Sequence, residues 1–148
     1  MIGLQKNLFT KRWSKVRALE PQEYEIQIAL VQRLKLIGRK DVLWFHVPNG
    51  EVRDKRVAAK LKAMGVMPGV ADLLFFWKHY WEDSEGSHVN LRALFLELKA
   101  SKRTQSDPQR HFEDRSKFIG IHYECADTID KAVSILTLYG ILPAKQAA

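Results

Sequence analysis

Two strongly apolar stretches of the sequence contain ionisable residues at positions that otherwise resemble a protein core. Asp72 lies at the start of the stretch 71–77, and Glu97 and Lys99 lie near the end of the stretch 91–99. Residues two apart in a strand point to the same face of a sheet, so Glu97 and Lys99 are expected to share a side. A buried carboxylate is costly unless a cation compensates it. If the two strands pair, these residues predict a Mg²⁺ or Mn²⁺ site with a lysine beside the metal-bound water.

A structural alternative exists for these three residues. Asp72 can be a simple strand-end aspartate, and Glu97 and Lys99 can be an ion pair where the sheet reaches solvent. The three residues alone favour this structural arrangement over a metal site.

The rest of the sequence predicts an alternation of helices and strands that would position these residues. Apolar residues recur at helical spacing from Pro21 to the stop at Gly38, and Asp127 is expected to cap a final helix. Residues 79–90 are polar and are expected to form an exposed connection. The expected order is helix 21–37, strand 42–47, helix 54–64, strand 71–77, strand 91–99, helix 106–119, strand 121–125 and a helix from 127. This order is typical of an α/β domain with a central sheet.

Composition limits the function classes. The 148 residues include 24 Lys and Arg against 17 Asp and Glu, a formal charge of +7 that suits a polyanion but does not require one. Cys125 is the only cysteine, which excludes an intrachain disulfide and favours a reducing compartment. No apolar stretch is long enough to span a membrane, and residues 1–20 lack the apolar core of a secretory signal, so we expect a cytoplasmic protein. The basic residues within positions 1–20 suit a phosphate-contacting arm, a solvated tail or a transit peptide.

The motifs resemble those of a known nuclease family. Residues 68–73 (Pro-Gly-Val-Ala-Asp-Leu) and 96–99 (Leu-Glu-Leu-Lys) resemble the PD-(D/E)XK nuclease signature, and in particular the VRR-NUC family, whose motifs are G-x-P-D-L, E-x-K and a downstream Gln. Glu23 and Gln27 resemble the family's E-x-x-x-Q, and residues 46–50 (His-Val-Pro-Asn-Gly) resemble a turn of its stand-alone phage-type members. Gln109 and Gly120 match the downstream elements. Ala71 departs from the usual proline, which supplies no metal ligand.

The resemblance covers residues 21–142 and implies a restriction-endonuclease-like core, with a central mixed sheet flanked by helices on both faces. It leaves residues 1–20 as a basic arm and residues 143–148 as a tail. It implies DNA as substrate, branched structures such as four-way junctions or flaps, and a homodimer. The segments 77–81 and 79–90 are the candidate dimer surfaces. No membrane and no small-molecule cofactor beyond the metal is expected.

The resemblance also implies roles for individual residues. Asp72, Glu97 and the Leu98 carbonyl would bind the metal, and Lys99 would position or activate the attacking water. Glu23 would complete the metal site from the first helix, and Gln109 would orient Lys99 or a metal-bound water. The expected DNA-contacting residues are His46, Asn49, Arg53, Lys55, Arg56, Lys60, Lys102, Arg103 and Arg110.

Several of these residues have structural alternatives. Glu23 and Gln27 can be a solvated pair on a helix. Gln109 follows Ser106 at capping-box spacing, so it can simply stabilise a helix start. His46 is favoured as a satisfied core histidine over a phosphate contact. Two other function classes also remain open, namely a nucleic-acid-binding module of this fold without catalysis and a basic protein-interaction domain.

Overall fold

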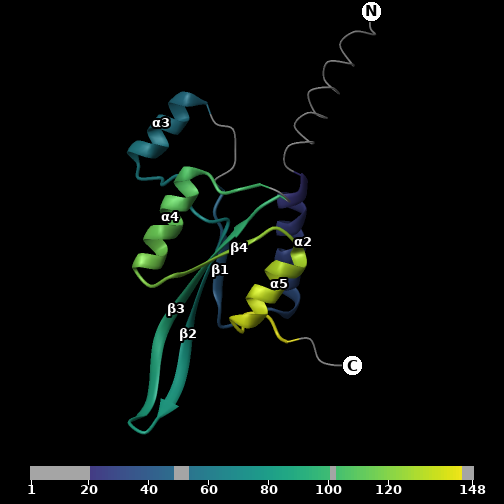
Figure 1. Cartoon of the computed structure of the whole chain (residues 1–148), viewed down its shortest axis with the longest axis vertical. Coiled ribbons are helices and arrows are strands. Elements are labelled where there is room, and N and C mark those ends of the chain that lie inside the picture. Colours follow the sequence, from purple (N-terminus) through teal and green to yellow (C-terminus); the bar gives the residue numbers. More distant parts are fainter. Residues whose placement is uncertain (1–20, 49–53, 101–102, 145–148) are drawn as a thin grey trace, which may run out of the picture.

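The computed structural model describes residues 21–48, 54–100 and 103–144 (Figure 1). The predicted arm 1–20 and the end of the predicted tail lie outside this range. In chain order the elements are α2 (Pro21–Ile37), β1 (Leu43–His46), α3 (Lys55–Ala63), β2 (Leu73–Asp83), β3 (Gly86–Leu98), α4 (Asp107–Phe118), β4 (His122–Ala126) and α5 (Ile129–Leu138). The predicted order of helices and strands is therefore confirmed. None of the helices in the described ranges combines the length and the apolar character that a membrane span needs.

The four strands form one mixed sheet in the order β1-β2-β3-β4. β1 and β2 are antiparallel, β2 and β3 are antiparallel, and β3 and β4 are parallel. Leu73 is the register partner of Leu96, so the start of β2 lies beside the end of β3. Figure 1 shows α2 and α5 on one side of the sheet and α4 on the other. This arrangement confirms the predicted central mixed sheet with helices on both faces.

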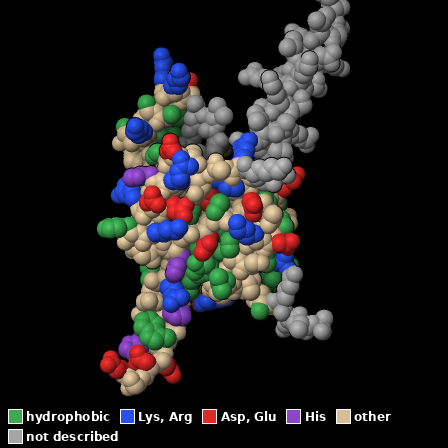
Figure 2. Space-filling view, in the orientation of Figure 1, with side chains coloured by type: hydrophobic (Ala, Val, Ile, Leu, Met, Phe, Trp, Pro, Cys, Tyr) green, Lys and Arg blue, Asp and Glu red, His purple; other side chains and the backbone are tan. Residues whose placement is uncertain are grey.

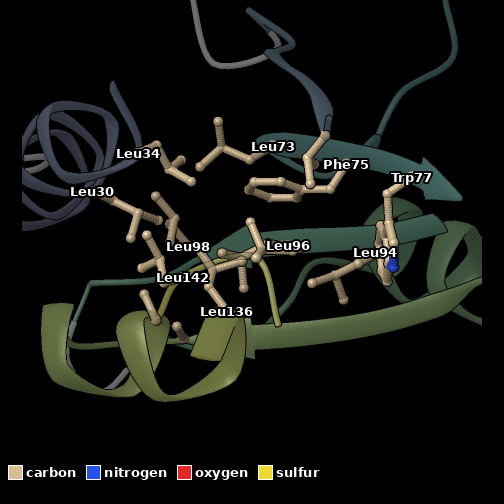
Figure 3. Packing of buried hydrophobic residues seen from close by; sticks show 14 residues of the cluster. Leu30, Leu34, Leu73, Phe75, Trp77, Leu94, Leu96, Leu98, Leu136 and Leu142 are labelled. Carbon is tan, nitrogen blue, oxygen red and sulfur yellow. The ribbon is translucent and has the colours of Figure 1, made fainter. Parts of the chain in front are cut away.

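The face of the sheet under α2 and α5 is dry. Leu73 and Phe75 of β2 and Leu96 of β3 are fully buried there, and Leu30 and Leu136 pack against them from the two helices (Figure 3). Burying a leucine or phenylalanine side chain stabilises a fold by about 1.5–3 kcal/mol. This face therefore supplies most of the hydrophobic core.

The opposite face carries a smaller apolar cluster. Leu74, Phe95 and Tyr123 are buried there, and Phe112 of α4 stacks on Phe95 with ring centroids 5.5 Å apart. Alternate residues of the same strands serve the two faces because side chains alternate along a strand.

β2 and β3 continue well past their neighbours as a two-stranded hairpin that projects from the body (Figure 1). The expected exposed connection over 79–90 is therefore mostly strand, and only the turn between Asp83 and Gly86 interrupts it. The β-favouring residues Tyr80, Trp81 and Val89 account for this extension. Asp83 accepts a 2.8 Å hydrogen bond from the N–H of Glu85, which shapes the turn.

Two local predictions need correction. Thr128, not Asp127, is the N-cap of α5, because its side chain accepts from the N–H of Lys131 at 3.2 Å. Trp77 is buried in the core and makes an edge-to-face contact with Tyr139, so it is not available as a dimer surface. The residues exposed on the hairpin include Tyr80 and Trp81.

α3 begins as predicted, since Asp54 accepts a hydrogen bond from the N–H of Arg56 at 2.8 Å. None of its residues, all of which the structure describes, is buried. The helix stands away from the sheet (Figure 1). Val57 on this helix and Met64 directly after it are exposed apolar residues.

Candidate active site

Asp72, Glu97 and Lys99 meet at one end of the sheet. Asp72 directly precedes β2, and its Oδ2 accepts a 2.7 Å hydrogen bond from the N–H of Leu98. Lys99 Nζ lies 2.7 Å from Glu97 Oε1. The pairing of β2 with β3 thus brings together the three residues singled out from the sequence, on the face covered by α4.

Gln109, in the first turn of α4, connects this cluster to that helix. Its Oε1 accepts a 2.9 Å hydrogen bond from Lys99 Nζ, and its Nε2 donates to Glu97 Oε1. The same Oε1 accepts from the backbone N–H of Ser106 at 2.9 Å. Gln109 therefore caps the helix and contacts the lysine at once, so both predicted contacts are present.

Glu23 contacts the site from α2. Its Oε1 accepts a 2.7 Å hydrogen bond from the N–H of Ala100, one residue beyond Lys99. Glu23 is thus tied to the backbone at the end of β3 and is not a freely solvated helix residue. Gln27 is half-buried one turn further along α2.

Burial controls the electrostatics of the cluster. Glu97 is 1% exposed, and this burial, together with the charge of Asp72, raises its pKa to about 7. Burial also raises the pKa of Asp72, which the hydrogen bond from Leu98 and the charge of Lys99 only partly offset. Two crowded carboxylates share one lysine, so the site holds more negative charge than it neutralises and favours an added cation.

The donor set suits a hard divalent cation. Mg²⁺ binds oxygen ligands, keeps several of its waters and often uses only one or two carboxylates. Asp72 and Glu97 supply two carboxylates on adjacent strands, with Leu98 between Glu97 and Lys99 in the chain. Over residues 21–48, 54–100 and 103–144, no cluster of three or more His, Cys, Asp or Glu side chains forms a complete metal cage. The residues therefore fit a sparsely liganded, water-rich ion and do not fit a closed structural metal.

His46 lies at the edge of this cluster. Its Nδ1 is 2.9 Å from the backbone carbonyl oxygen of Asp72, and the N–H of Val47 donates to the same oxygen at 3.0 Å. The side chain is exposed, so the favoured interpretation of His46 as a core histidine is wrong. A ring N–H at Nδ1 that donates to the carbonyl oxygen of Asp72 fixes the imidazole beside the predicted metal ligands.

The predicted DNA-contacting residues divide into two groups. Lys55, Arg56 and Lys60 lie exposed on α3, and Figure 2 shows basic side chains over α3 and over the start of α4. Arg103 is exposed before α4, and Arg110 bonds to the Gln105 carbonyl oxygen and to Asp107 at the start of that helix. Asn49, Arg53 and Lys102 lie outside the described residues.

The sequence analysis assigned no role to two contributors to the site, Tyr123 and Gly69. Tyr123 of β4 donates a hydrogen bond to Glu97 Oε2 at 3.5 Å from the buried side of the site. Gly69 has a φ of +79°, and a Cβ there would lie 2.6 Å from the backbone N of Gln109. The alternation of the strand 121–125 gave a signal for Tyr123, whereas the contact of Gly69 is between distant segments and leaves no local signal.

Comparison with known proteins supports the fold. No family model matches the sequence, and no curated protein gives a significant match. Among solved structures, a VRR_NUC domain protein is similar to this chain with a TM-score of 0.57 at 22% sequence identity, over 80% of this chain and 87% of the other. The predicted resemblance is thus confirmed in three dimensions. The chain has the restriction-endonuclease-like fold of a VRR-NUC domain protein.

Proposed function

We propose that this protein is a Mg²⁺- or Mn²⁺-dependent endonuclease that hydrolyses phosphodiester bonds of DNA. The observation that carries the proposal is the meeting of Asp72 and Glu97 from neighbouring strands, with Lys99 Nζ 2.7 Å from Glu97. A stability role alone does not explain a buried and a half-buried carboxylate whose pKa values burial raises in both cases. The fold shared with a VRR_NUC domain protein supports the same chemistry.

Each residue of the cluster has a role in this proposal. Asp72 and Glu97, with the Leu98 carbonyl, would hold the cation, which when bound supplies Lewis acidity and a more acidic water. Lys99 would orient or deprotonate the attacking water. Gln109 would hold Lys99 in place through its 2.9 Å hydrogen bond, and Glu23 would fix the backbone beyond it.

DNA is the substrate that the surface charge favours. α3 carries four basic residues and no acidic one, and all of them are exposed. Each phosphate that a lysine or arginine neutralises releases counterions, so binding is expected to weaken steeply with salt. His46, fixed by Asp72, would contact a phosphate next to the site. Among DNA substrates we propose branched forms such as four-way junctions or flaps, in line with the sequence resemblance.

We also propose that the protein acts as a homodimer in the cytoplasm. A two-fold partner would present a second active site for the second strand of a duplex. The exposed Tyr80 and Trp81 of the projecting hairpin are the candidate contact. The free thiol of Cys125 suits a reducing compartment. Light scattering of the wild type and of a Trp81→Glu variant tests the contact, and an unchanged dimer in that variant would move the interface elsewhere.

A nicking assay on supercoiled plasmid and on a synthetic four-way junction tests the activity. The wild type should cleave in Mg²⁺ but not in EDTA, and Lys99→Ala should reduce the rate by about 10²–10⁴-fold while DNA binding persists. Lys117→Ala is the matched control, because it also removes a lysine paired with a glutamate, and the Lys117 side chain is exposed. Salt-sensitive binding without cleavage would identify a non-catalytic binding module. The absence of both binding and cleavage would identify a protein-interaction domain.

A further inference from the structure

Glu97 is contacted from two opposite directions. Lys99 and Gln109 both contact Oε1, on the side of the proposed metal site. The other oxygen, Oε2, accepts a 3.5 Å hydrogen bond from the hydroxyl of Tyr123, a buried residue of β4. Glu97 and Tyr123 lie on neighbouring strands, where Glu97 pairs in register with Cys125, two residues beyond the tyrosine. The sheet itself therefore places the phenol behind the carboxylate.

A second polar residue fixes the direction of this hydroxyl. Gln105 Nε2 lies 3.4 Å from the tyrosine oxygen and also donates to Glu113 Oε2 at 2.7 Å. Because the amide N–H occupies an acceptor position of the phenol oxygen, the hydroxyl hydrogen is left to donate to Glu97. Hydrogen bonds linked in this way strengthen one another.

We propose that Tyr123 is a positioning residue that holds the Glu97 carboxylate, through Oε2, in the orientation that binds the divalent cation. This inference rests on the proposed function. A carboxylate on a metal is commonly hydrogen-bonded in turn by a neighbouring side chain, and loss of such a partner typically reduces metal affinity or activity by about 10–100-fold. Tyr123 does not contact the metal or the DNA in this proposal, and Gln105 acts through it.

The packing of Tyr123 can be separated from its hydroxyl. The ring contacts Phe112 edge to face, with centroids 6.2 Å apart. A Tyr123→Phe substitution keeps this contact and removes only the donor. Tyr139→Phe is the matched control, because the hydroxyl of Tyr139 donates to Glu124 at 3.0 Å, on the other face of β4. Both variants lose one hydroxyl bonded to a glutamate, and only Tyr123→Phe loses one that contacts the proposed site.

The experiment measures Mn²⁺ binding to the full-length protein by calorimetry, and cleavage as a function of Mg²⁺ concentration. Tyr123→Phe should bind Mn²⁺ about tenfold more weakly than the wild type and should approach the wild-type cleavage rate at saturating metal. Tyr139→Phe should match the wild type in both measurements. Gln105→Met, which removes the amide that orients the hydroxyl, should weaken Mn²⁺ binding in the same direction by a smaller factor.

The possible outcomes separate this inference from the proposed function. If the wild type binds Mn²⁺ and cleaves DNA while Tyr123→Phe has unchanged metal affinity, the positioning role is wrong and the nuclease proposal stands. An equal loss of affinity in both phenylalanine variants would show a general effect of hydroxyl removal and would also overturn the inference. A wild type that neither binds Mn²⁺ nor cleaves overturns both proposals.

Discussion

The two faces of the sheet use the same strands for different purposes. On the face under α2 and α5, Leu73, Leu96 and Leu98 are fully or almost fully buried in an apolar cluster. On the face under α4, Asp72 and Glu97, which are sequence neighbours of these leucines, form a polar cluster. Because side chains alternate along a strand, residues that are adjacent in the sequence contribute to the apolar core on one face and to the polar cluster on the other. The dry face provides the rigid support that the crowded carboxylates on the other face require.

The largest effect is expected from damage to the dry face. Leu96 is fully buried, so Leu96→Ala should lower the free energy of unfolding by about 2–5 kcal/mol. The cleavage rate per folded molecule should change little at a temperature where the variant remains folded, because Leu96 points away from the polar cluster. Chemical denaturation and the nicking assay measure the two quantities. A large loss of activity in fully folded Leu96→Ala would show that the two faces are not separable.

A second change tests how the loop before β2 supports the polar face. Gly69→Ala introduces a side chain at a φ of +79° and forces its Cβ against the backbone of Pro108 and Gln109. Gly65→Ala is the control, because Gly65 has a φ of +90° and a Cβ added there would meet no atom within 4 Å. The positive φ is expected to cost about 1–3 kcal/mol in either variant, and the clash with Pro108 and Gln109 adds to this cost in Gly69→Ala. Only Gly69→Ala should also reduce cleavage, because it displaces Gln109 from Lys99. Equal activity in the two variants would contradict this role of the loop.

The third expected effect is on the polar face and depends on pH. The pKa of Glu97 is raised from its usual 4.5 to about 7, so the folded state keeps its proton over a range where the unfolded state has lost it. Stability is therefore lost as the pH rises from about 4.5 to about 7. Without metal, the unfolding free energy of Glu97→Gln relative to the wild type should rise by about 2 kcal/mol between pH 5 and pH 7.5.

Denaturation at a series of pH values in EDTA measures this difference, and Glu113→Gln provides the control. Burial alone raises the pKa of Glu113, but hydrogen bonds from Lys117 and Gln105 lower it overall. Its contribution is lost only as the pH falls below its usual value, so this variant should show a flat difference between pH 5 and pH 7.5. A flat difference for Glu97→Gln as well would mean that Lys99 fully compensates the buried carboxylate.

Most of the fold and the central residues of the site can be predicted from the sequence. Apolar periodicity predicts the order of the elements, and charges inside apolar strands identify Asp72, Glu97 and Lys99 because burial makes such residues exceptional. The predicted cap of α5 is one residue too early, since Asp127 and Thr128 are both good N-caps and only the local backbone distinguishes them. Local patterns of this kind depend on neighbours in the chain, which the sequence displays directly.

Features that depend on distant contacts are harder to predict. His46 ends an apolar strand, and only its position at the edge of the sheet leaves it exposed beside Asp72. The double role of Gln109 requires the distance from the start of α4 to Lys99, which spacing along the chain does not determine. The polar residues of the hairpin predict a loop, although its aromatic residues favour strand.

The length of β2 sets the distance between the polar cluster and the exposed tip of the hairpin. Asp72 directly precedes this strand and Trp81 lies nine residues further along it, which at about 3.3 Å per residue corresponds to ~30 Å. The pairing of β2 with β3 continues without interruption from Leu73 to Asp83. In the proposed homodimer, a partner subunit bound at the hairpin tip would therefore lie at a distance from the carboxylates that the length of this one strand sets.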